Sequence, residues 1–294
     1  MKQTSFSIDF PAVLKALEVA AKTYGEGAEK ILRVIANRLL ERLDFIRLNP
    51  LRVVDFGSRT AYTTRVLLNR YKKAEIISFH FSVSLLNRVK DGFQRYCDSK
   101  MVIGEYTLVP FVDRSVDLIF SNLTFQWSFD LHQTLQECQR ILRPGGLLLF
   151  STVGPDTLKE LRESFSDKKR HVHTFYDMHD IGDMLTHCHF LDPVMDMEYL
   201  SIRYSSVLQL MADLKVIGAH NAAQDRSRGL MGRNQWYQML KAYERWRDEN
   251  HTIPATIEVI YGHAFGSEIS SSCQNSQAQE VFIPVSDIKR RVNN

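Results

Sequence analysis

The sequence predicts an α/β protein whose central sheet is doubly wound, with helices on both faces. Short apolar segments of strand length alternate with helical segments from residue 51 to residue 152. Such alternation is typical of βαβ units, and their right-handed crossovers place helices on both faces of a parallel sheet. The first apolar segment ends in Asp55 and Gly57. The sequence therefore predicts a Rossmann-like layer with a ligand site at the carboxyl ends of its strands.

The composition is that of a globular protein and excludes several classes. Of the 294 residues, 44% are hydrophobic and 24% are charged, so the chain is neither disordered nor a coiled coil. Lysine and arginine number 37 against 34 acidic residues, a balance that does not predict a nucleic-acid-binding face. No apolar run approaches the roughly 20 residues of a membrane span, and residues 1–11 do not resemble a signal peptide.

The cysteines and histidines do not predict a disulfide framework or a metal site. The four cysteines are too widely spaced for a CxxC motif: Cys97, Cys138, Cys188 and Cys273. We interpret them as reduced thiols in a cytoplasmic protein. The two imidazoles of His187-Cys188-His189 are one residue apart near a predicted helix end, a spacing that does not place them on one face.

The first fifty residues predict two helices. Val13, Leu14 and Leu17 recur at helical spacing after Pro11, which suits a first helical turn. The segment 24–27 interrupts this pattern. A second helix follows, with one apolar face made of Ile31, Ile35, Leu39 and Leu43.

Five strands and three helices are predicted next. The strands are expected at residues 51–56, 76–81, 101–103, 116–121 and 147–152. The helices are expected at 60–70, 82–93 and 131–142, and the turn Arg143–Gly146 ends the last of them.

From Pro155 the chain is predicted to be mostly helical, with two more strands that bring the sheet to seven. The helices are expected at 157–165, 177–187, 205–217 and 234–247, and the strands at 194–202 and 255–264. A segment rich in Ser and Gln, 267–279, predicts a mobile tail. We divide the chain into N-terminal helices (1–50), a core (51–154), a helical insertion with the final strands (155–266) and the tail (267–294).

The loop after the first strand is the main candidate for a ligand site. Gly57 permits a positive φ and a close approach of a ligand to the backbone. The helix that follows offers free N–H groups and the positive end of its dipole. Because the loop holds a single glycine, its spacing is also that of an ordinary β–α turn, and both interpretations stay open on spacing alone.

Four short motifs in the right order resemble the class I S-adenosylmethionine-dependent methyltransferases. Asp55-Phe56-Gly57 resembles their motif I, in which a strand ends in Asp-x-Gly-x-Gly-x-Gly. Gly104-Glu105, 117–122 and 142–146 resemble the adenine motif, the fourth strand and the turn before the fifth strand. The resemblance implies a seven-stranded mixed sheet with an N-terminal helical lid, and S-adenosylmethionine as cofactor. The cofactor-binding residues would be Asp55, Gly57, His80, Glu105, Tyr106 and Asn122.

Longer segments resemble the malonyl-acyl-carrier-protein O-methyltransferases of biotin synthesis, over about residues 10–266. These segments are Ala20–Tyr24, Ser121–Trp127, Gly154–Leu161, Asp213–Asn221 and Glu258–Gly266. The resemblance implies methylation of the free carboxyl of a malonyl thioester, which gives the ester that primes pimeloyl synthesis. A carboxyl group has an ordinary pKa of about 4, so it is ionised at neutral pH and needs no general base. Catalysis would then be mostly alignment of the reacting groups.

Three residues depart from the cofactor motifs of that family. Arg59 and Ala61 replace the second and third glycines of motif I, and His80 stands where an acidic residue would hold the ribose hydroxyls. The loss of one charged hydrogen bond, about 1.5–3 kcal/mol, would weaken binding about 10- to 100-fold. Either Arg59 turns outward and His80 donates to a ribose oxygen, or the chain is a degenerate paralogue that only binds carrier protein or another protein.

Four residues are candidates for substrate contact. Tyr24, in the implied lid, would orient the substrate carboxylate as the catalytic residue, and a capping aromatic is the alternative. Arg162 would bind that carboxylate through a bidentate guanidinium, helped by Lys159, and a solvated helix face is the alternative for both. Trp127 would line the methyl-transfer pocket or be an ordinary buried tryptophan.

The resemblance implies an acyl carrier protein as partner. Because that partner is acidic, a basic docking face would steer it. The candidates are Lys168, Lys169, Arg170, Arg226, Arg228 and Arg233. We expect a monomer with no nucleic-acid or membrane partner. A factor that modifies or chaperones a protein is a further function that the sequence leaves open.

Overall fold

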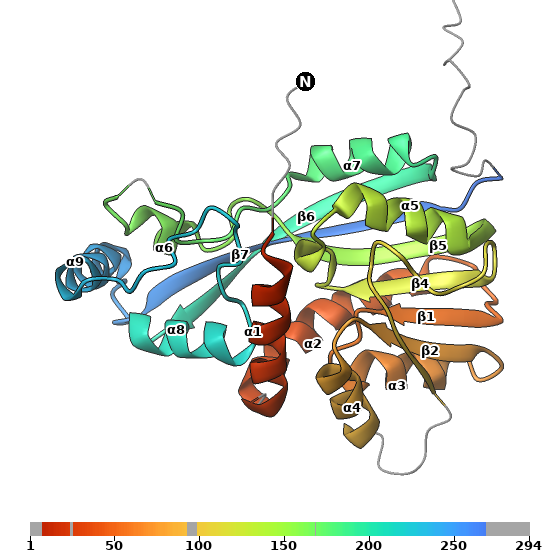
Figure 1. Ribbon diagram of the computed structural model, residues 1–294, viewed down its shortest axis with the longest axis horizontal. Coiled ribbons are helices and arrows are strands. Elements are labelled where there is room, and N and C mark those ends of the chain that lie inside the picture. The colour runs from red at the N-terminus through yellow and green to blue at the C-terminus, as the bar shows by residue number, and fades with distance from the viewer. Residues whose placement is uncertain (1–7, 24–25, 93–98, 168, 269–294) are drawn as a thin grey trace, which may run out of the picture.

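A seven-stranded mixed sheet with helices on both faces forms the centre of the molecule (Figure 1). The computed structural model describes residues 8–23, 26–92, 99–167 and 169–268. The strand order is β3-β2-β1-β4-β5-β7-β6. Neighbouring strands from β3 to β5 pair in parallel, whereas β7 pairs antiparallel to both β5 and β6. This confirms the predicted fold class.

The elements follow the predicted order closely. The strands are β1 (Arg52–Phe56), β2 (Glu75–His80), β3 (Lys100–Ile103), β4 (Val116–Asn122), β5 (Leu142–Val153), β6 (Leu191–Tyr204) and β7 (Ile253–Phe265). The α-helices are α1 (Phe10–Thr23), α2 (Glu26–Glu41), α3 (Ala61–Arg70), α4 (Val83–Gly92), α5 (Leu131–Ile141), α6 (Lys159–Glu163), α7 (Met178–His187), α8 (Val207–Val216) and α9 (Arg233–Tyr243). Short 3-10 helices are η1 (Arg42–Asp44), η2 (Phe125–Trp127) and η3 (Glu244–Trp246).

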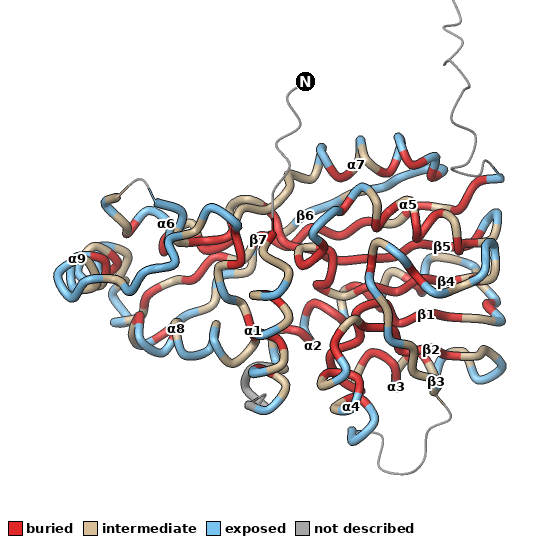
Figure 2. Tube along the Cα trace, viewed as in Figure 1, coloured by how far each residue is buried: buried red, intermediate tan, exposed pale blue. Residues whose placement is uncertain are grey.

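Alternating residues of the strands supply two cores, one on each face of the sheet. Val53 of β1 and Leu118 of β4 belong to the core that α2 and α3 cover. Val54 and Ile119, their chain neighbours, belong to the opposite core, which α5 and α7 cover. Most residues of the central strands are buried, as Figure 2 shows. Burial of an aliphatic side chain contributes about 1.5–3 kcal/mol to the free energy of folding.

The N-terminal helices lie over the carboxyl ends of the strands. Helix α1 packs on α4 and α8, while α2 contacts β4 and β5. Leu17 of α1 and Leu39 of α2 are completely buried. These contacts place α2 directly beside the loop that follows β1.

The last two strands extend beyond the others and carry a third core. Figure 1 shows β6 and β7 continuing past the rest of the sheet, where α6, α8 and α9 surround them. Tyr243, Leu210 and Ile253 are buried there. This extension forms one wall of the cavity described below.

Two elements differ from the sequence prediction. The segment Arg143–Gly146, expected as a turn before β5, lies within that strand, where the register with β4 shifts between Val116 and Leu118. Helix α6 is shorter than expected because Leu158, just before it, has a φ of 55°. The predicted tail from residue 269 lies outside the described residues. In the part of the chain that is described, no helix is both long and apolar enough to cross a membrane.

Candidate active site

The loop after β1 makes its sharp turn at Gly57, which has a φ of +80°. Its N–H donates to the carbonyl of Phe79 at 2.7 Å, tying the loop to β2. A Cβ on Gly57 would overlap the side chain of Thr124, which follows β4. The turn therefore requires glycine for two reasons, its positive φ and the close packing of Thr124.

Asp55 anchors this loop from inside the sheet. Its carboxylate is buried and accepts hydrogen bonds from the hydroxyls of Thr63, at 2.8 Å, and Thr64, both in the first turns of α3. Burial raises the pKa of Asp55, while the two threonine hydrogen bonds oppose that shift. The carboxylate thus holds β1 and α3 at the relative position that the loop needs.

His80 ends β2 and is completely buried. Its Nδ1 accepts a hydrogen bond from the N–H of Ser82 at 2.8 Å, so the ring carries its proton on Nε2 when neutral. Burial lowers the pKa of His80 well below its ordinary value, and the positive charge of Arg59 adds to this. The neutral ring can therefore donate from Nε2, as the first hypothesis for this residue requires.

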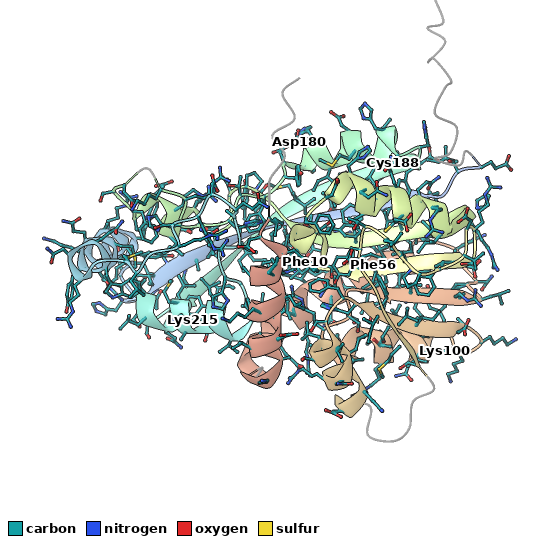
Figure 3. The ribbon with its side chains drawn as sticks, in the orientation of Figure 1. Phe10, Phe56, Lys100, Asp180, Cys188 and Lys215 are labelled. Carbon is teal, nitrogen blue, oxygen red and sulfur yellow. The ribbon has the colours of Figure 1, made fainter. Side chains whose placement is uncertain are left out.

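A row of aromatic rings connects the start of α1 with the end of β1. Phe10 lies 5.0 Å from Phe81, Phe81 lies 4.9 Å from Tyr106, and Tyr106 lies 4.9 Å from Phe56, all between ring centroids. Figure 3 labels the two ends of this row, Phe10 and Phe56. The Tyr106 hydroxyl is buried and has no hydrogen-bond partner among the described residues. Burial raises the pKa of Tyr106, so the hydroxyl remains a neutral donor.

Arg59 turns inward, contrary to the hypothesis that it turns outward. Its side chain is buried, with 7% of the residue exposed, and its guanidinium carbon lies 5.5 Å from the ring centroid of Trp127. Nη2 of Arg59 is buried and finds no hydrogen-bond acceptor in the described part of the chain. A cationic group thus occupies the space that the second glycine of motif I would leave open.

A largely apolar cavity of about 310 Å³ lies beside Arg59. Besides Arg59 and Ile257, five segments supply its walls: Ile31–Ile35, Leu123–Trp127, Val153–Leu161, His171–Phe175 and Met211–Asn221. Lys215 of α8, labelled in Figure 3, lines it as well. Three of the segments that resemble the malonyl-acyl-carrier-protein methyltransferases meet at this cavity, although they are far apart in the sequence.

Two residues of the cavity wall have strained backbones. Leu123 and Leu158 have φ values of 51° and 55°, a region that residues other than glycine, asparagine and aspartate rarely adopt. Such strain persists where the surroundings impose it, and it is frequent at ligand sites. It supports the view that the cavity is a functional site.

Histidines line the same cavity next to Trp127. His173 stacks on Trp127 with 6.4 Å between centroids, and burial lowers its pKa to about 4. His171 is bound by Asp167 at 2.6 Å and stacks on Phe165. Sequence analysis did not single out either histidine as a site residue. Their proximity to Trp127 depends on a chain reversal that no local pattern indicates.

The cofactor candidates do not all reach the loop. Asn122 lines the small space beside Gly57, donates to the Leu32 carbonyl at 3.2 Å and accepts from Ser151 at 2.9 Å. It therefore links β4 to α2. Glu105 is exposed and forms an isolated β-bridge with Leu108.

The substrate candidates separate into one inside the cavity and two outside it. Trp127 lines the cavity. The guanidinium of Arg162 donates to the carbonyls of Pro155, at 2.6 Å, and Thr157, at 2.9 Å, and neither Arg162 nor Lys159 lines the cavity. Lys159 lies over the Tyr199 ring at 5.4 Å. Tyr24 lies outside the described residues.

Several of the basic docking candidates already have acidic partners. Arg170 pairs with Asp225 at 3.3 Å, while Arg226 and Arg228 approach Asp9 at 2.8 and 3.6 Å. Lys169 and Arg233 are exposed, and Lys168 lies outside the described residues.

The residues around the loop fit an adenosyl cofactor in their chemistry. The Tyr106 hydroxyl and Nη2 of Arg59 are buried donors that lack acceptors among the described residues, and His80 adds a neutral ring. The free space directly beside Gly57 is about 20 Å³, because α2 closes it from the other side. That volume holds about one water molecule, so a bound cofactor requires α2 or the Arg59 side chain to move.

Comparison with known proteins identifies the family of this chain. Residues 54–150 match the sequence model of a family described as a methyltransferase domain. The chain is 60% identical over 291 residues to malonyl-acyl-carrier-protein O-methyltransferase 1 of Coxiella burnetii, an alignment that covers 99% of this chain and 100% of that relative. It is also 42% identical over 268 residues to the malonyl-acyl-carrier-protein O-methyltransferase of Gallionella capsiferriformans, an alignment that covers 88% of this chain and 92% of that relative.

The fold likewise has solved relatives. The crystal structure of the YcgJ protein from Bacillus subtilis superposes with a TM-score of 0.57 at 15% identity, over 79% of this chain and 99% of that one. The fold, the family model and the full-length relatives together define a class I methyltransferase that uses S-adenosylmethionine. The chain belongs to the family of malonyl-acyl-carrier-protein O-methyltransferases.

Proposed function

We propose that this chain transfers a methyl group from S-adenosylmethionine to the free carboxyl of a malonyl thioester on acyl carrier protein. The observation that carries the proposal is the 310 Å³ cavity, which is apolar except for a few groups and has the buried guanidinium of Arg59 in its wall. A malonyl thioester has a matching pattern, because one methylene group separates its thioester from one terminal carboxylate. The names of the relatives support the same substrate.

The chain would act mainly by positioning and by removing water. The apolar walls, among them Leu123, Leu158 and Trp127, would strip water from the substrate carboxylate and hold it toward the loop after β1. When bound, the cofactor supplies a methyl group on a positively charged sulfur. Because a carboxylate is already ionised at neutral pH, no side chain has to remove a proton.

The cofactor would be held by the elements around Gly57. The loop after β1, anchored by Asp55, presents its backbone, and the neutral ring of His80 offers an Nε2 proton to a ribose oxygen. Tyr106 offers its unpartnered hydroxyl. Asn122 links this site to α2, and we propose that the N-terminal helices act as its lid.

The setting proposed for the enzyme is the cytoplasm, where it acts as a monomer on an acidic carrier protein for biotin synthesis. The exposed cations Lys169 and Arg233 are the docking candidates that have no acidic partner among the described residues. Arg170 forms an ion pair with Asp225, and Arg226 and Arg228 form ion pairs with Asp9. Electrostatic steering by such residues would raise the association rate and weaken with salt.

The test is the mass of the carrier protein after reaction. Purified protein is incubated with S-adenosylmethionine and malonyl-acyl carrier protein, with acetyl-acyl carrier protein as the matched control. We expect one methyl ester on the malonyl form and no change in the acetyl form. A malonyl carrier that is bound but never methylated would contradict the proposal and favour the degenerate, binding-only paralogue.

A further inference from the structure

Arg59 is the most unusual group in the site, because its buried positive charge has no counterion. In the described part of the chain, no carboxylate forms an ion pair with it. The nearest acidic group of the loop, Asp55, is already engaged by Thr63 and Thr64. The stacking on Trp127 supports the cation but leaves Nη2 without an acceptor.

Apart from Asp55, whose carboxylate is held by Thr63 and Thr64, the side chains described around Arg59 offer it no negative charge. Burial keeps His80 neutral and holds the Tyr106 hydroxyl protonated. A buried charge without a partner is costly, and the cost is recovered when an anion enters and accepts its hydrogen bonds. The arrangement is therefore suited to an anionic ligand group, and a planar guanidinium matches a carboxylate in particular.

The position of Arg59 indicates which carboxylate this is. The residue lines both the small space beside Gly57 and the large apolar cavity, and its guanidinium lies against Trp127, on the cavity side. An acyl chain in that cavity would bring its terminal carboxylate to Nη2, next to the loop after β1.

We propose that Arg59 is the receptor for the substrate carboxylate and so determines specificity for a dicarboxylic acyl group over a monocarboxylic one. This inference rests on the proposed function. It assigns to the residue that departs from motif I the task that the sequence analysis gave to Arg162. Arg59, which replaces the second glycine of motif I, would thus bind the substrate.

The experiment measures binding of malonyl- and acetyl-acyl carrier protein by titration calorimetry, with S-adenosylhomocysteine present. The variants are Arg59→Met, which removes the charge, and Arg59→Lys, which keeps the charge but loses the planar fork. Arg65→Met is the matched control, because Arg65 is exposed in the same region and donates to the Gly92 carbonyl.

We expect the wild-type protein to prefer the malonyl form by about 10- to 100-fold, the effect of one charged hydrogen-bonding pair. In Arg59→Met this ratio falls to about one, in Arg59→Lys it is intermediate, and in Arg65→Met it is unchanged. Retention of the full preference in Arg59→Met would overturn the inference. Equal binding of both carriers by the wild type would overturn it too, while methyl-ester formation would still stand as the separate test of the function.

A second titration distinguishes the substrate carboxylate from the carboxylate of the cofactor. S-adenosylhomocysteine carries a carboxylate, and 5′-methylthioadenosine lacks it. If Arg59 binds the substrate, Arg59→Met leaves the affinity ratio of these two ligands unchanged, and bound S-adenosylhomocysteine also shows that the variant is folded. A loss of at least about tenfold that is confined to S-adenosylhomocysteine would assign Arg59 to the cofactor and overturn the proposal.

Discussion

Replacing Gly57 by alanine tests the claim that the loop after β1 is shaped by the protein's own packing. Gly57 has a φ of +80°, and a Cβ there would overlap the buried side chain of Thr124. Gly145 offers a matched comparison, since its φ is +75° and no atom lies within 4 Å of an added Cβ. The two positions share the backbone strain and differ in the steric overlap.

The expected magnitudes follow from those two contributions. A left-handed conformation costs an alanine about 1–2 kcal/mol, which is the whole expected effect of Gly145→Ala. Overpacking in a buried site adds about 1–3 kcal/mol, so Gly57→Ala should lower the free energy of unfolding by about 2–5 kcal/mol. Thr124→Gly removes the overlapping atoms, so in the Gly57→Ala background it should recover the part of the lost unfolding free energy that comes from overpacking.

Urea unfolding of the four variants, including the Gly57→Ala/Thr124→Gly double variant, measures these values. The double variant should lose less stability than the sum of the two single variants, by about 1–3 kcal/mol. Equal losses for Gly57→Ala and Gly145→Ala, or strict additivity in the double variant, would refute the packing argument.

Three further predictions concern other parts of the site and its support. Burial lowers the pKa of His173 to about 4, so the free energy of unfolding that is present above pH 6.5 falls as the pH drops toward 4. In urea titrations, His173→Asn should remove up to about 3 kcal/mol of this pH dependence. An unchanged pH profile in the variant would contradict this prediction. Buried Glu160 accepts hydrogen bonds from the N–H and the hydroxyl of Thr256, so Glu160→Gln should lower the free energy of unfolding by about 1–3 kcal/mol. Glu163→Gln, which alters an exposed ion pair, should lower it by less than about 1 kcal/mol. Equal losses in the two variants would contradict the stabilising role of the buried carboxylate. The positive charge of Arg59 disfavours the positively charged sulfur of S-adenosylmethionine nearby. Arg59→Met should therefore shift the affinity ratio measured by calorimetry toward S-adenosylmethionine over S-adenosylhomocysteine, and a shift the other way would refute this prediction.

Local patterns predicted the elements of this fold well, since most of them depend on short-range periodicity. The alternating faces of β1 and β4 and the turn at Gly57 could be expected from neighbouring residues. Asp55 was expected to bind the cofactor, and its anchoring of α3 through Thr63 and Thr64 was not predicted. The bulged start of β5 could not, because it depends on how β5 pairs with β4.

The cavity was less predictable, because its walls come from segments that only tertiary packing brings together. His173 meets Trp127 across a chain reversal, and Lys215 comes from α8 on the extension of the sheet. The resemblance pointed to three of the five wall segments without indicating that they meet. The inward direction of Arg59 has no local signal, because it depends on the stacking partner, Trp127, that η2 supplies.

The central claim is that the altered motif still binds the methyl donor. Titration calorimetry of the full chain with S-adenosylhomocysteine, and then with S-adenosylmethionine, tests it most directly. We predict saturable binding of both ligands, with dissociation constants of roughly micromolar order. A folded protein that binds neither ligand, even at concentrations of about a millimolar, would contradict the methyltransferase account.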